Sequence, residues 1–168
     1  HATGTIGNGH GTAAYFGLEK EVDIQLGTLS KSLGSVGGYV AANSTIIDYL
    51  VNTSRSFIFS TALSPADIGA ALAALHVLES DVSVLQRLHE NVNYMADRLI
   101  SIGIDATNET PIFPILIGHN EDTLAVSNYL YEAGIIGTAI RPPTVPIGES
   151  RIRLTVTAAH NKEQIDYV

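Results

Sequence analysis

One lysine stands apart from the other charged residues of this chain. The chain has three lysines, and Lys31 lies in the run "GTLSKSLGSVGG" among glycine, serine and aliphatic residues. An ammonium group that loses hydration in such surroundings favours its neutral amine, which is the nucleophile that Schiff-base chemistry requires. The ordinary alternative is a surface lysine whose charge stays in water. The setting of Lys31 favours the catalytic interpretation.

Small hydroxyl side chains accompany this lysine. Thr28 and Ser30 precede it, and the pair Ser60–Thr61 follows later in the chain. Hydroxyl donors beside a glycine-rich backbone are typical of loops that bind phosphate. The loop lacks both the G-x-x-x-x-G-K-[ST] pattern and a dinucleotide-binding glycine pattern, so a nucleotide-binding module is the weaker interpretation. For Ser60–Thr61, the structural alternative is to end a strand and cap a helix.

The elements that must position these residues follow from the spacing of apolar residues. In the first part of the chain we expect strands over 22–26, 37–42 and 56–63, and helices over 65–79 and 85–102. Ser64 supplies an N-cap and Pro65 the favoured first position of the first helix, and Gly103 ends the second. The strands at 22–26 and 37–42 thus flank the loop that carries Lys31.

The pattern changes after residues 103–112. In the second part of the chain we expect strands over 113–117, 135–140 and 151–157, and helices over 121–133 and from Asn161 onward. This order predicts a compact α+β unit. We therefore divide the chain into residues 1–103 and 104–168.

Composition excludes several classes of function. The chain has 168 residues, 45% of them hydrophobic and 15% charged, which indicates a globular protein. With 17 acidic and 9 basic residues and no basic cluster, nucleic acid is a poor partner. Cysteine is absent, the histidines lack metal-site spacing, and no apolar run approaches the roughly 20 residues of a membrane span. We expect no metal, no membrane association and a cytoplasmic location.

Four blocks of sequence, taken together, resemble a known enzyme family. They are "HATGTIGNGHG", "VDIQLGTLSKSLGSVGGYVAAN", "FIFSTALSP" and "IRPPTVPIGESRIRLTVTAAH". In this order they are similar to the α-oxoamine synthases, pyridoxal 5′-phosphate (PLP) enzymes of the aspartate aminotransferase fold type. The resemblance implies an α/β fold. Residues 1–103 would be the carboxy-terminal part of the PLP-binding large domain, mainly a parallel sheet with helices, and 104–168 a small α+β domain.

The resemblance also implies roles for the residues around the lysine. Lys31 would attach PLP covalently and later move the proton of the substrate Cα, and Thr28 would contact the cofactor phosphate. His1 would hydrogen-bond the phenolic oxygen of the cofactor. Ser60 and Thr61 would reach the phosphate of the neighbouring subunit, which implies a homodimer with shared sites. The aspartate that pairs with the pyridine nitrogen in this family would precede His1, so this piece could be inactive by itself.

On the substrate side, the resemblance makes Arg153 the residue that binds the amino-acid carboxylate, a task suited to a planar guanidinium. Arg151 shares its sheet face and competes for this role, and the spacing to the end of the block favours Arg153. Thr144 would contact substrate. His160 is expected to be structural.

The implied reaction joins an amino acid to an acyl thioester with loss of CO₂. The segment "RPPTVP" is most similar to family members that use L-alanine with pimeloyl-CoA or the pimeloyl carrier protein, in biotin biosynthesis. Glycine C-acetyltransferase or another family activity is the alternative. A catalytically silent subunit or binding module of the same fold is a further alternative, although Lys31, Thr28 and Arg153 would then have no task.

Overall fold

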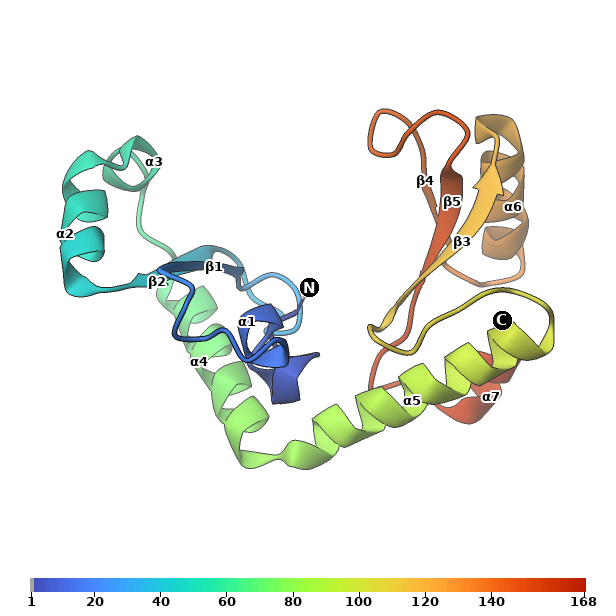
Figure 1. Cartoon of the computed structure of the whole chain (residues 1–168), viewed down its shortest axis with the longest axis horizontal. Helices are drawn as coiled ribbons and strands as arrows, with labels where there is room; N and C mark the ends of the chain where they lie inside the picture. Colours follow the sequence, from blue (N-terminus) through green and yellow to red (C-terminus); the bar gives the residue numbers. More distant parts are fainter. Residues whose placement is uncertain (1) are drawn as a thin grey trace. The chain divides into compact units, whose positions relative to one another are not determined.

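The computed structural model describes residues 2–168 (Figure 1). These residues form two compact units, the first ending at Leu85 and the second running from Gln86 to Val168, and each is described by itself. The division falls inside a helix, earlier in the chain than the domain boundary expected after residue 103. Because a compact cluster of contacts is not the same as a domain, the boundary at 103 stays a prediction.

The first unit is built around a β-hairpin. Its strands, β1 (Ile24–Thr28) and β2 (Gly38–Ala42), pair antiparallel, with Thr28 opposite Gly38. The helices of this unit are η1 (Gly7–Gly9, a 3-10 turn), α1 (Thr12–Tyr15), α2 (Ser44–Thr53), α3 (Arg55–Ile58) and α4 (Pro65–Ser80). The predicted strands at 22–26 and 37–42 are thereby confirmed, with the first shifted toward its carboxy end.

Helix starts in this unit follow the expected capping chemistry. The Ser64 hydroxyl accepts a hydrogen bond from the backbone N–H of Asp67 at 3.2 Å, and Pro65 opens α4 as predicted. Asn43 caps α2 in the same way by accepting from the Ile46 N–H at 3.0 Å. Helix α2 is not predicted from sequence, although Asn43 is a residue type that favours the N-cap of a helix.

The strand predicted over 56–63 is wrong. The backbone N–H groups of Phe57 and Ile58 donate to the Ser54 carbonyl, at 3.1 and 2.9 Å, which folds this stretch into α3. Beyond Ile58 the chain has no regular secondary structure until α4 begins. A run of aromatic and aliphatic residues looks strand-like, but a strand also needs a neighbour for its backbone groups.

The second unit is a three-stranded sheet with helices (Figure 1). Its strands are β3 (Ile112–Gly118), β4 (Thr138–Ile140) and β5 (Ser150–Thr155), in the order β3-β5-β4, with both pairs antiparallel. Its helices are most of α5 (Val82–Ser101), then α6 (Asn120–Glu132) and α7 (Lys162–Tyr167). Pro114 is accommodated because β3 is an edge strand. Helix α6 lies along the sheet.

The core of the described chain lies mainly in the second unit. Phe113 and Ile152 are each 1% exposed. The other buried apolar side chains of this unit are Leu88, Val92, Met95, Ala96, Leu99, Leu154, Val156 and Ile165. Buried residues alternate through Ile152 and Leu154 of β5 to Val156 just after it, which leaves the intervening residues on the other face.

Most elements predicted for this second unit are confirmed, with two strands shortened. The strand expected over 151–157 ends at Thr155. The strand expected over 135–140 begins only at Thr138, because the Ile135 N–H donates to the Leu130 carbonyl at 2.8 Å and so belongs to the end of α6. Within residues 2–168 both sheets are antiparallel, so the parallel sheet of the implied large domain is not formed by these strands. No single helix among these residues is long and apolar enough to cross a membrane, and α4 with α5 meets that test only as a broken pair.

Candidate active site

The lysine loop, residues 29–37, connects β1 to β2. The Leu29 N–H donates to the Gly37 carbonyl at 2.9 Å, and the Ser35 N–H donates to the Leu29 carbonyl at 2.8 Å, which closes the base of the loop. Leu33 is 3% exposed and anchors the tip. Gly34 has φ +59°, a conformation that side-chain-bearing residues rarely adopt, and follows the turn in which its N–H donates to the Lys31 carbonyl.

Two serine hydroxyls attach this loop to other parts of the first unit. Ser32 Oγ donates to the Thr3 carbonyl at 2.6 Å, and Ser35 Oγ donates to the Asp67 carbonyl at 2.6 Å. The first bond reaches the amino-terminal segment and the second reaches the first turn of α4. The part of the loop that follows Lys31 is therefore held by tertiary contacts.

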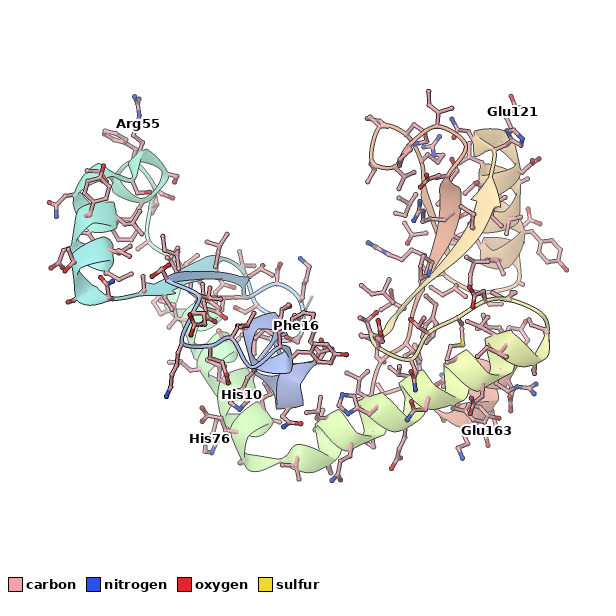
Figure 2. The ribbon with its side chains drawn as sticks, viewed as in Figure 1. His10, Phe16, Arg55, His76, Glu121 and Glu163 are labelled. Carbon is pink, nitrogen blue, oxygen red and sulfur yellow. The ribbon has the colours of Figure 1, made fainter. Side chains whose placement is uncertain are left out.

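Lys31 and Thr28 line the same cavity, whose volume is about 620 Å³. Its wall also includes His10, Phe16 and Tyr39, and Figure 2 shows His10 and Phe16 close to the short helix α1. The cavity thus brings together an amine, a hydroxyl and aromatic surface. This combination suits a flat, phosphate-bearing molecule that can be held covalently by an amine.

The hydroxyl of Thr28 belongs to a small polar cluster at the end of β1. Thr28 Oγ1 lies 2.8 Å from Ser30 Oγ, accepts from the Ser30 N–H at 3.2 Å and donates to the Gly37 carbonyl at 3.3 Å. The cluster is pre-formed by the chain itself. It therefore presents hydroxyl groups at a fixed position, as a phosphate site requires.

Lys31 differs from the expectation in one respect. From sequence we expect its ammonium to be desolvated, but among the described residues its side chain is exposed. Of the neighbouring apolar residues, Leu33 is buried and Val36 is itself exposed, so apolar neighbours in sequence do not make a buried environment here. The chain places the lysine at a cavity without covering it.

Two of the other predicted residues are not at this cavity. Ser60 and Thr61 are exposed and do not line it, and they follow α3 rather than a strand. In Figure 2, Arg55 on α3 lies well away from His10 and Phe16. His1 lies outside the described residues, so its role stays a prediction.

Arg151 and Arg153 were competing candidates on β5, and their surroundings distinguish them. Arg151 Nε donates to the Glu149 carbonyl at 2.9 Å, and its Nη2 pairs with the Glu149 carboxylate at 3.0 Å. Arg153 is exposed, and its guanidinium has no hydrogen bond or ion pair among residues 2–168. A guanidinium already engaged by a carboxylate is poorly placed to bind another, so the structure favours Arg153 as the free cation.

Arg153 lines a second cavity, of about 700 Å³, together with Thr155, Thr157 and His160. His160 Nδ1 accepts a hydrogen bond from the Thr157 N–H at 3.1 Å, in keeping with the expected structural role. Thr144 does not line this cavity. It closes a turn in which its N–H donates to the Arg141 carbonyl at 3.0 Å, and its side chain is exposed.

Two residues near the two cavities are not predicted to be functional from sequence. Tyr39 lines the lysine cavity, and a Cβ atom at Gly27, its neighbour across the hairpin, would overlap its ring. Asn91 is buried on α5 and bonds the chain after β5. Its signal was a polar residue within a helical apolar stripe. Among residues 2–168, no group of three or more His, Asp or Glu side chains is arranged to hold a metal ion.

Comparison with known proteins defines the family. The family described as aminotransferase class I and II matches residues 1–168, and the chain belongs to it. The 8-amino-7-oxononanoate synthase of Lysinibacillus sphaericus is 45% identical over 170 residues, which cover 100% of this chain and 44% of that protein. The chain spans less than half the length of the curated relatives it matches, between 42% and 44% for the first three.

Solved structures agree with this assignment. Serine palmitoyltransferase from S. paucimobilis, with bound PLP and myriocin, superposes with a TM-score of 0.92 at 28% identity, covering 98% of this chain and 42% of that one. The 8-amino-7-oxononanoate synthase from Francisella tularensis superposes with a TM-score of 0.84 at 27% identity, covering 98% and 49%. The resemblance to the α-oxoamine synthases and the α/β fold class, as part of a larger domain, are confirmed.

Proposed function

We propose that this chain supplies the cofactor lysine and the substrate arginine of a PLP-dependent acyltransferase. The enzyme would join an amino acid to an acyl thioester with loss of CO₂. The observation that carries the proposal is the shared cavity of Lys31 and Thr28 in a chain about 45% identical to 8-amino-7-oxononanoate synthases. The bound PLP of the serine palmitoyltransferase neighbour supports the choice of cofactor.

The residues present fit PLP. The cluster of Thr28 and Ser30 offers hydroxyl groups for the phosphate, and Lys31 offers the amine for the aldehyde carbon of the cofactor. PLP, when bound, withdraws electrons from the Cα of an attached amino acid. Because the described residues leave Lys31 exposed, we infer that the remaining walls are supplied by protein that this chain does not span. His1 would bind the cofactor's phenolic oxygen.

Lys31 would have two tasks. Its Nζ atom would hold the cofactor, and with an amino acid bound the same atom would accept the proton from the substrate Cα. The hydrogen bonds of Ser32 and Ser35 would hold the backbone that follows Lys31, and the Leu29–Gly37 bond the base of the loop, while the side chain moves. A fixed backbone with a mobile amine suits these two consecutive tasks.

Arg153 would bind the carboxylate of the amino acid. Its guanidinium has no partner within residues 2–168, whereas Arg151 is held by Glu149. A planar guanidinium can bind both carboxylate oxygens, which orients the substrate as well as attracting it. Thr144 is the proposed further substrate contact.

For the substrates, we propose L-alanine with pimeloyl-CoA or the pimeloyl carrier protein, giving 8-amino-7-oxononanoate. The names of the relatives support this choice. The likeness to serine palmitoyltransferase makes serine with a longer acyl thioester the competing pair. An assay of the full-length protein with alanine, glycine and serine separates these possibilities, and a preference for glycine with acetyl-CoA would assign it to glycine C-acetyltransferase instead.

The cofactor proposal is tested by chemical trapping. The full-length protein is loaded with PLP, reduced with borohydride, digested and analysed by mass spectrometry. We expect the adduct on the peptide containing Lys31. Lys20 and Lys162 are the other lysines of this chain, so Lys20→Ala and Lys162→Ala are matched controls that should keep the adduct. An adduct that survives Lys31→Ala would overturn the proposal.

We further propose a cytoplasmic homodimer with shared active sites. Ser60 and Thr61 are exposed and lie outside the Lys31 cavity, as residues that serve a neighbouring subunit would. Mixing an inactive Lys31→Ala protein with an inactive double variant, Ser60→Ala with Thr61→Ala, should restore part of the activity through hybrid dimers. Mixtures that stay inactive, although hybrid dimers form, would contradict shared sites.

A further inference from the structure

Asn91 is a polar side chain on the buried face of α5. It is 9% exposed and lies among buried residues such as Val92 and Met95. An amide in such a place costs free energy unless its donors are paired. Both donors are used, because Nδ2 donates to the Thr157 carbonyl at 2.9 Å and to the His160 carbonyl at 2.8 Å. Since both partners are acceptors, the amide nitrogen must face them.

The residues that Asn91 holds form a turn between β5 and α7. The turn has its own bonds, from the His160 N–H to the Thr157 carbonyl at 3.3 Å and from the Thr157 N–H to His160 Nδ1 at 3.1 Å. Asn91 adds two long-range bonds, across 66 and 69 residues of sequence. It therefore attaches a locally closed turn to a long helix.

This turn contributes to the wall of the cavity that Arg153 lines. Thr157 and His160 lie in that wall with Arg153. The strand register ends at Thr155, and one further backbone bond joins the Val156 N–H to the Pro111 carbonyl at 3.0 Å. Strand pairing thus fixes Arg153 but does not extend to the turn, which is where Asn91 acts.

We propose that Asn91 is a positioning residue for the amino-acid substrate. By holding the Thr157 and His160 carbonyls, it fixes the wall of the cavity in which Arg153 receives the substrate carboxylate. This inference rests on the proposed function, because it assumes that Arg153 binds that carboxylate. Asn91 itself touches neither substrate nor cofactor in this scheme.

Two substitutions distinguish the effect of the hydrogen bonds of Asn91 from the effect of its side-chain volume. Asn91→Leu keeps a similar volume and leaves both carbonyls without its donors. Asn91→Asp turns an oxygen toward two carbonyl oxygens, which repel it until the carboxyl gains a proton and can donate one hydrogen bond. Asn93→Asp is the matched control, because Asn93 is an exposed amide on the same helix whose Oδ1 accepts from Asn108 at 2.8 Å.

The test uses the full-length holoenzyme, with amino-acid KM and kcat measured at pH 6 and pH 8 relative to wild type at the same pH. Amide hydrogen exchange at Thr157 and His160 is measured alongside. We expect Asn91→Leu to raise KM about tenfold at both pH values, with kcat within about twofold and faster exchange at both amides. Asn91→Asp should match it at pH 8 and recover part of the loss at pH 6. Asn93→Asp should behave as wild type.

Three results would overturn the inference in different ways. Faster exchange with unchanged KM would make Asn91 a structural residue only. A KM increase in Asn91→Asp that is the same at pH 6 and pH 8 would exclude the loss of the two carbonyl hydrogen bonds as its cause. This measurement can be made even if Asn91→Leu fails to fold. If Arg153→Lys leaves the amino-acid KM unchanged, the proposed function of Arg153 fails and the positioning role falls with it. The exchange data would still show whether Asn91 holds the turn.

Discussion

The two units of this chain differ in how they bury their apolar residues. In the second unit, the sheet and helices enclose a contiguous set of side chains that includes Phe113, Ile152 and Leu154. Among the described residues of the first unit, only Leu33 and Ala71 are buried hydrophobic residues. Leu26 is 82% exposed and Phe59 is 78% exposed. Exposed apolar surface on this scale is unusual for a protein that stands alone.

The unit that carries Lys31 and the unit that contains the hydrophobic core are different parts of the chain. Helix α4 has apolar residues around its whole circumference, a pattern typical of a buried helix, yet Ile68 and Leu72 are exposed here. The first unit carries Lys31 on a scaffold that needs covering by further protein. The second unit carries Arg153 on a scaffold that has its own core. Lys31 therefore lies in a unit that depends on further protein, and Arg153 lies in a unit with a core of its own.

The largest effect should come from separating the two parts. We expect residues 82–168, which keep α5 whole, to unfold in one cooperative transition when expressed alone, because they contain the core. Residues 1–81 should show no such transition. Circular dichroism during urea titration measures both fragments. A cooperative transition in residues 1–81 would contradict the view that the first unit has no core of its own.

Single substitutions should reproduce the contrast on a smaller scale. Phe113→Ala removes a ring that is 1% exposed and should lower the free energy of unfolding by about 3–5 kcal/mol. Leu26→Ala removes an exposed side chain and should change it by less than about 0.5 kcal/mol in this chain. Urea unfolding of the 168-residue chain compares them. Equal losses would mean that the first unit has a core of its own.

Two glycines should respond in opposite directions. A Cβ atom at Gly137 would lie 2.7 Å from Leu130 Cδ1 and 2.9 Å from Ile152 Cγ2, so Gly137→Ala should cost about 1–3 kcal/mol. Gly69, within α4, has nothing within 4 Å of that position. Gly69→Ala should stabilise the chain by about 0.5–1 kcal/mol, because alanine favours helix. Thermal unfolding of both variants gives the signs, and destabilisation by Gly69→Ala would contradict the open surface of α4.

The smallest effect concerns pH and the attachment of α7 to α5. The Tyr94 hydroxyl donates to Asp166 at 2.8 Å, and this bond raises the pKa of Tyr94 above its model-peptide value of 10.0. A raised folded-state pKa means that the bond stabilises the second unit fully below about pH 10 and is lost as pH rises through the folded pKa. The difference in thermal midpoint between wild type and Tyr94→Phe should thus shrink from pH 8 to pH 11.

The control for this pH effect is Tyr129→Phe on α6. The Tyr129 side chain is exposed, and its hydroxyl has no hydrogen bond among the described residues. Its midpoint difference from wild type should stay near zero at both pH values. A Tyr94→Phe difference that is the same at pH 8 and pH 11 would mean that the Asp166 bond does not contribute to stability.

Prediction from sequence succeeded where a single element carries its own signals. Ser64 with Pro65, and Gly103 after an apolar stripe, mark helix ends that local chemistry enforces. The stretch 56–63 could not be predicted in this way, because the Ser54 carbonyl, rather than a strand partner, takes its N–H groups. Local composition does not reveal which acceptor a backbone group will find.

The candidate site shows the same division. Thr28 ends β1 and Lys31 lies three residues later in the loop, so their common cavity could be expected from sequence. Arg151 and Arg153 share a strand face, and only the bond of Arg151 to Glu149 separates them. Asn91 could not be assigned a task from sequence, since its partners are backbone carbonyls 66 and 69 residues away. Contacts between distant segments require the fold.

The close approach of Gly27 to the Tyr39 ring across the hairpin has an evolutionary consequence. A side chain at position 27 would enter the space of the Tyr39 ring, so position 27 cannot become larger while that ring is present. The two should therefore behave as an epistatic pair. In a library of variants, alanine or larger residues at 27 should survive only together with a small residue at 39. Any such exchange would move aromatic surface out of the wall of the lysine cavity.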